Sequence, residues 1–90
     1  FQVDTESGVV RFAYDSHPAY AYAVVYVFNR TQGVGVITMS LEDGSVEPTA
    51  PFPGVSGDQV VVSFELSDQR TATCIEIQPG QSSSANECVP

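Results

Sequence analysis

The sequence predicts an all-β fold: a small antiparallel β-sandwich, immunoglobulin-like, with six or seven strands and one disulfide. Alternation of apolar and polar residues is clearest at 59–66, where the even-numbered residues from Val60 to Leu66 would face a core. Turn-forming residues recur about every ten positions, and no segment shows a helical period. An open β-barrel is the alternative architecture.

Apolar runs between these turns define the individual strands. We expect strands at 1–4, 9–14, 20–28, 34–41, 59–66 and 71–77. Glycine, proline, aspartate and asparagine supply the backbone conformations of the turns between them. The Ser-rich segment 79–87 is predicted to be a loop that Cys88 anchors at its far end.

The strand expected at 20–28 has two apolar faces, which predicts a central strand covered on both sides. Because a core needs large side chains, we expect its even-numbered face, with Tyr20, Tyr22 and Phe28, to point inward. The alanine-rich odd face would then be an outer surface suited to close packing of another chain. In the next strand, the odd-numbered residues of 37–41 are expected to face the core. The alternative is an exposed aromatic row that stacks on sugars or contacts a protein partner.

Size and charge restrict the possible partners. The 90 residues are enough for a single domain, 1–90, and the 42% of hydrophobic residues are enough for one core. The net charge is −8, lysine is absent, and the cations are Arg11, Arg30 and Arg70. Nucleic acid and anionic membranes are therefore poor partners. No apolar run is long enough to cross a bilayer, and we expect any signal peptide to have been removed.

Two cysteines predict the compartment. A bridge between Cys74 and Cys88 would close a short loop and stabilise the fold by about 3 kcal/mol. Two cysteines alone cannot supply a four-ligand zinc site. A disulfide indicates an oxidising environment, so we expect a secreted or cell-surface protein. The alternative is two unrelated buried thiols.

Catalytic chemistry has little support in the sequence. Asp15, Ser16 and His17 are the three residue types of a catalytic triad, but neighbours on a turn do not point together. Paired carboxylates could hydrolyse glycosides, but a chain of this size rarely builds the necessary cleft. We expect a protein that is not an enzyme and that has no cofactor.

Acidic turns raise calcium binding as an alternative, with candidate ligands Asp4, Glu6, Asp15, Glu42 and Asp43. The segment 1–10, continued by Tyr14-Asp15 and 20–27, resembles the middle of a cadherin repeat. The Asp-Arg-Glu turn and the Asp-Asn-Asp linker of that family are missing here. The resemblance therefore implies a shared β-sandwich rhythm, and we expect no bound metal.

Two surface features are candidate sites. The segment 48–55 is stiffened by prolines, and we favour a crossover between strands in which Phe52 caps the core. The alternative is a projecting contact loop, for which Pro51, Phe52, Pro53 and Val55 are the candidate binding residues. The triplet that begins at Asn29 is an N-glycosylation sequon on a predicted turn.

We therefore expect a secreted β-sandwich that binds a protein or a glycan, with Tyr20 and Tyr22 among the candidate contacts. One alternative is a small protease inhibitor that inserts segment 48–55 into a protease. Another is a subunit of an extracellular fibre, in which self-association adds strand 1–4 to the sheet edge of a neighbour.

Overall fold

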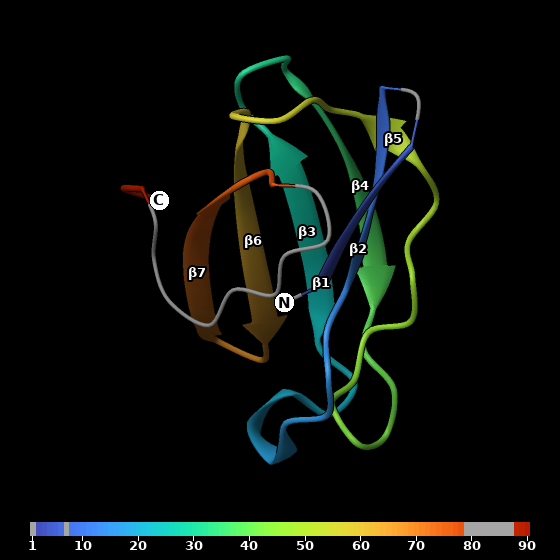
Figure 1. Cartoon of the computed structure of the whole chain (residues 1–90). Helices are drawn as coiled ribbons and strands as arrows, with labels where there is room; N and C mark the ends of the chain where they lie inside the picture. The colour runs from blue at the N-terminus through green and yellow to red at the C-terminus, as the bar shows by residue number, and fades with distance from the viewer. Residues whose placement is uncertain (1, 7, 79–87) are drawn as a thin grey trace.

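The computed structural model describes residues 2–6, 8–78 and 88–90 (Figure 1). In these ranges the strands are β1 (Gln2–Glu6), β2 (Val9–Ala13), β3 (Val24–Asn29), β4 (Val34–Met39), β5 (Phe52–Pro53), β6 (Gln59–Leu66) and β7 (Gln69–Glu76). A short 3-10 helix, η1 (Pro18–Tyr20), lies between β2 and β3. Phe1, the first residue of the predicted N-terminal strand, and the predicted loop 79–87 lie outside the described residues.

The strands form two antiparallel sheets, ordered β1-β2-β5 and β4-β3-β6-β7. Figure 1 shows β7, β6, β3 and β4 side by side in the larger sheet. In that sheet β3 lies between two partners, because Val27 is opposite Val36 of β4 and Val62 of β6. The all-β prediction is therefore confirmed, together with the central position of β3.

The core takes side chains from both sheets. Its buried residues are Val10, Phe12, Ala23, Val25, Val27, Val46, Phe52, Val60, Val62, Phe64, Ile75 and Ile77. Burial of one such aliphatic or aromatic side chain contributes about 1.5–3 kcal/mol. The even-numbered residues of β6 face inward as their alternation predicts. In the described ranges, no helix has the length and apolar character that spanning a membrane requires.

The predicted inward face of β3 is wrong. Val25 and Val27 are buried, whereas Tyr26 is half-buried and Phe28 is exposed on the opposite face. The strand also begins at Val24, because Pro18 starts the 3-10 turn and the chain reaches the sheet only after it. Tyr20 and Tyr22 therefore precede the strand.

The predicted orientation of β4 is wrong for the same reason. Met39 is opposite Val24, and Ile37 is opposite Tyr26, so both share the outer face of β3. Leu41, which follows β4, is exposed as well. The predicted outer alanine surface is also overturned, since Ala23 is fully buried. The two strands thus pair with each other, but in both of them the face that was predicted to be buried is the outer face.

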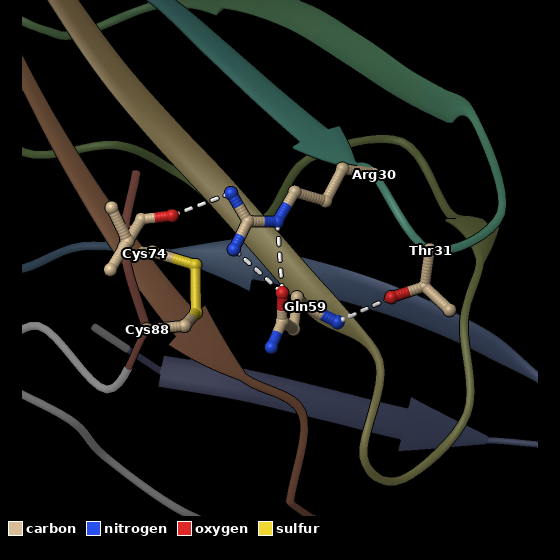
Figure 2. Close-up of a disulfide and its surroundings, with 6 residues drawn as sticks. Arg30, Thr31, Gln59, Cys74 and Cys88 are labelled. Atoms are coloured by element: carbon tan, nitrogen blue, oxygen red, sulfur yellow. Dashed lines mark hydrogen bonds between the residues drawn. A yellow bond between two sulfur atoms is a disulfide. The ribbon is translucent and has the colours of Figure 1, made fainter.

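The disulfide prediction is confirmed. A disulfide joins Cys74 and Cys88, whose Cα atoms are 5.1 Å apart (Figure 2). The backbones of the same two residues also form an isolated antiparallel β-bridge. Cys74 lies on the outer face of β7, in the same row as Val61 and Phe28. The bond therefore attaches the C-terminal residues 88–90 to the edge of the larger sheet.

Removal of this bond should destabilise the fold. Replacing both cysteines by alanine (Cys74→Ala with Cys88→Ala) should lower the free energy of unfolding by about 3 kcal/mol, because the unfolded chain regains the entropy of the open loop. Urea titration followed by circular dichroism measures the change. Reductant should shift the wild type by a similar amount and leave the variant unchanged. A loss below about 1 kcal/mol would show that the loop constraint contributes little.

Candidate functional site

Exposed apolar side chains gather on the outer face of β3 and β4 and on the residues just before β3 and just after β4. We call this group the outer band; its members are Tyr22, Phe28, Ile37, Met39 and Leu41. The exposed fractions of Ile37 and Met39 are 69% and 56%, which is high for large apolar side chains on a strand. Contiguous exposed apolar surface of this kind marks interaction sites in folded proteins.

Backbone pairing places the outer band on neighbouring segments of the sheet. Ile37 is opposite Tyr26 and Met39 is opposite Val24, two partly buried residues of β3 that lie between Tyr22 and Phe28 in the chain. One row further along, the amide of Tyr22 donates a hydrogen bond to the carbonyl oxygen of Leu41 at 3.2 Å. The band thus follows two neighbouring strands and rests on a hydrogen-bonded backbone.

Tyr22 has a left-handed backbone conformation, with a φ of 56°, and 60% of its surface is exposed. A bulky residue in this region is strained by roughly 1–3 kcal/mol relative to glycine. Such outliers concentrate at functional positions, which supports Tyr22 as a contact residue.

An open groove of about 550 Å³ lies beside the outer band. Its lining residues are Tyr26, Val27, Phe28, Arg30, Gly35, Val36, Ile37, Val61, Ser63 and Arg70. Gly35 allows β4 to lie close to β3, because a Cβ atom there would overlap the carbonyl oxygen of Val27. Most of the lining residues are therefore apolar, and Gly35 leaves part of the β4 wall without a side chain.

Two arginines bound the groove. The guanidinium of Arg70 lies 5.9 Å from the centre of the Tyr26 ring, within the range of a cation–π interaction. Arg30 donates from Nε and Nη2 to Oε1 of Gln59 at 2.9 and 2.6 Å, and from Nη1 to the carbonyl oxygen of Val89 (Figure 2). The guanidinium of Arg30 is thus held by neutral hydrogen-bond partners, whereas that of Arg70 contacts an uncharged ring.

The predicted glycosylation at Asn29 is incompatible with the folded chain, because Asn29 is fully buried. Its Nδ2, which would carry the sugar, donates hydrogen bonds to the carbonyl oxygen of Pro53 at 3.0 Å and to Oδ2 of Asp58 at 2.9 Å. Its Oδ1 accepts from the amide of Gln32 at 3.1 Å. The asparagine of the sequon therefore has a structural role, as part of a buried hydrogen-bonded cluster.

Asp58 is the acceptor at the centre of this cluster. Its Oδ2 accepts from Asn29, from Nε2 of Gln32 at 2.7 Å and from the amide of Val55 at 3.1 Å. The hydrogen bond from Asn29, followed by that from Gln32, lowers the pKa of the carboxyl below its usual 3.8, while burial acts in the opposite direction. The cluster joins the β3–β4 turn to the segment before β6.

The segment 48–55 lies along β2. The amide of Thr49 donates to the carbonyl oxygen of Phe12 at 2.9 Å, and the amide of Phe12 donates to Oγ1 of Thr49 at 3.1 Å. Phe52 is only 3% exposed and belongs to the core, so the crossover in which it caps the core is confirmed. The alternative, in which Phe52 projects as a contact residue, is wrong.

The other predicted contacts of this segment remain at the surface. Pro51, Pro53 and Val55 are exposed beside the buried Phe52. They lie on one side of β5, away from the outer band, which belongs to the other sheet. The structure therefore does not bring them together with Tyr22.

The aromatic cluster near η1 packs around Tyr20. The rings of Tyr20 and Phe64 are stacked with centroids 4.4 Å apart, and the ring of His17 lies 4.7 Å from Tyr20. Nδ1 of His17 accepts a hydrogen bond from the amide of Ala19 and so caps the turn. Tyr20 is therefore partly buried at the edge of the core. In the described part of the chain, no three His, Cys, Asp or Glu side chains are grouped as metal ligands.

The signal for the outer face was present in the sequence. Arg30 continues the even-numbered face of β3 two residues after Phe28, and a charged residue there indicates solvent. Gly35 on the odd-numbered face of β4 is a second signal, since a core face favours larger side chains. The burial of Asn29 had no such signal, because its partner Asp58 is far away in the sequence.

The Asp58 cluster should make stability depend on pH. Because the folded-state pKa of Asp58 is below 3.8, its contribution is present at higher pH and is lost as the pH falls from about 3.8 through the folded-state pKa. Asp58→Asn should cost about 1–3 kcal/mol at pH 7 and flatten the acid limb of the stability profile. Urea titrations across acidic pH measure both effects. Asp68→Asn, on the exposed β6–β7 turn, is the matched control, and equal profiles for the two variants would contradict the prediction.

No protein-family model, curated protein or solved structure matches this chain.

Proposed function

We propose that this chain is a secreted, non-enzymatic binding module that contacts a protein partner through the outer band. The observation that carries the proposal is the gathering of exposed aromatic, aliphatic and thioether side chains on paired strands. Tyrosine, phenylalanine, methionine and arginine are the residue types that protein interfaces favour. A backbone held by cross-strand hydrogen bonds loses little entropy when a partner binds.

The proposal includes an immunoglobulin-like β-sandwich. Two features support it: a core that takes residues from both antiparallel sheets, and the strand orders β1-β2-β5 and β4-β3-β6-β7. In immunoglobulin-like domains, a sheet of the first, second and fifth strands packs on a sheet whose order has this form. Such domains often bind partners through the outer face of a sheet or through the loops at its ends.

The Cys74–Cys88 disulfide supports secretion or display at a cell surface, because such bonds persist in oxidising compartments. Aromatic side chains alone would suit a glycan as well as a protein. The aliphatic and thioether members of the outer band, Ile37 and Met39, favour a protein, since sugars stack on flat aromatic rings.

The protease-inhibitor alternative draws less support from the geometry. An inhibitory loop must extend away from its scaffold, whereas Thr49 and Phe52 bind segment 48–55 to β2 and to the core. Fibre assembly by strand addition would use β1, a terminal strand of the smaller sheet. That alternative makes no use of the outer band.

Charges placed on the outer band should abolish binding without unfolding the domain. We expect the double variant Ile37→Asp with Met39→Asp to lose the partner by at least about tenfold, because buried unpaired carboxylates are costly at an interface. Both side chains are exposed, so stability should change by less than about 1 kcal/mol. Affinity enrichment from the extracellular fluid of the source, quantified by mass spectrometry, measures partner retention.

The matched control is Val55→Asp, which places a carboxylate on an exposed apolar residue outside the band. Proteins retained by the wild type and the control, but lost by the double variant, are band-dependent partners. Retention of every enriched protein by the double variant would contradict the proposal. Urea midpoints of all three proteins check that each is folded.

A further inference from the structure

We propose that the groove beside the outer band binds an extended polypeptide segment in which apolar side chains are flanked by aspartate or glutamate. This inference rests on the proposed function and specifies the chemistry of the partner. It comes from the distribution of charge, from the bonding of two arginines, and from the positions of these arginines in the groove lining.

Charge is distributed very unevenly over this chain. Its net charge is −8, yet two of its three cations, Arg30 and Arg70, line one groove. The described residues that line this groove include no aspartate or glutamate. Glu65 is the cross-strand neighbour of Arg70 and lies outside the lining. The groove is thus a positive apolar surface on an acidic protein, and it complements a partner that is both apolar and acidic.

Both arginines keep donors for a carboxylate. Arg30 donates one hydrogen bond from each of Nε, Nη1 and Nη2 to uncharged oxygens. A guanidinium has five N–H groups, so others remain for a further acceptor. The guanidinium of Arg70 lies over the ring of Tyr26, near the outer limit of a cation–π contact, and its N–H edges can still reach a carboxylate. A planar guanidinium can bind a carboxylate through two parallel hydrogen bonds.

The spacing of the two arginines indicates the shape of the ligand. The guanidinium of Arg70 lies over the Tyr26 ring, and Arg30 follows Tyr26 by four residues, just after the end of β3. At ~3.3 Å per residue, the backbone positions of Tyr26 and Arg30 are separated by roughly 13 Å, about the length of four extended residues. Phe28 and Ile37 lie among the lining between and beside the two charges. A small carboxylic acid would reach one arginine, whereas an extended segment reaches both and covers the apolar surface.

The test begins with a selection. A library of short linear peptides displayed on phage is selected on the wild-type domain, and recovered sequences are synthesised for fluorescence anisotropy. We expect peptides that combine aromatic or aliphatic residues with aspartate or glutamate, and binding that weakens as salt increases. Arg70→Gln should weaken binding by about tenfold, the value of one lost charge-assisted hydrogen-bond pair.

The matched control is Arg11→Gln, which changes the net charge equally but lies on β2 in the other sheet. It should change affinity by less than about twofold, since screening removes distant charges. A charge exchange gives a direct readout: Arg70→Glu should lose the acidic peptides and regain affinity for versions in which lysine replaces the carboxylate. Arg30→Gln tests the second contact in the same way.

The outcomes separate the two proposals. Some peptides could bind in a way that depends on Ile37 and Met39 and yet lack acidic residues, or bind the Arg70→Gln variant with unchanged affinity. Either result would overturn the acidic-segment inference and leave the proposed binding module intact. A selection without band-dependent peptides would overturn both. Sedimentation of the wild type as a dimer that Ile37→Asp with Met39→Asp dissociates would also overturn the inference, because the occupant would then be a second copy of the chain.

Discussion

The alternation of β6 is the constraint on which the larger sheet depends. β6 is hydrogen-bonded on both sides, so burial of its even-numbered face decides which face of every neighbour is buried. Val27 is opposite Val62, which turns the odd-numbered residues of β3 inward. Ile75 is opposite Val60, which does the same for β7. A one-residue slip of either pairing would expose that strand's core face, so one pattern orients the whole sheet.

This constraint explains how far the sequence predicts the molecule. The approximate positions of most strands followed from local patterns, because alternation and turn residues act over a few positions; the late start of β3 and the two-residue β5 did not. The inward face of β3 could not be predicted from its own sequence, because both of its faces are apolar. The register of its pairing with β6 determines which face is buried. Phe12, Phe52 and Phe64 already fill the core, so the aromatic residues of β3 are not needed there.

The candidate site is a consequence of the same arrangement. Once Val25 and Val27 are buried, Tyr26 and Phe28 must lie on the outer face, beside the odd-numbered residues of β4. The groove could therefore be predicted only after the orientation of β3 was known. The buried cluster around Asn29 is the converse case: a motif associated with the surface is recruited to the interior, because Asp58 supplies a charge-assisted partner.

The C-terminal disulfide also has a mechanical consequence. A load applied through residues beyond Cys88 enters the fold at Cys74, inside β7, and bypasses the residues between the two cysteines. Those 13 residues cannot extend while the bond is intact, which withholds roughly 45 Å of contour length at ~3.4 Å per residue. The force then acts on the ladder between β7 and β6, which pairs eight residues of each strand. Such a domain carries the load through its hydrogen-bonded sheet, and the segment between the two cysteines adds nothing to the length by which the chain can extend.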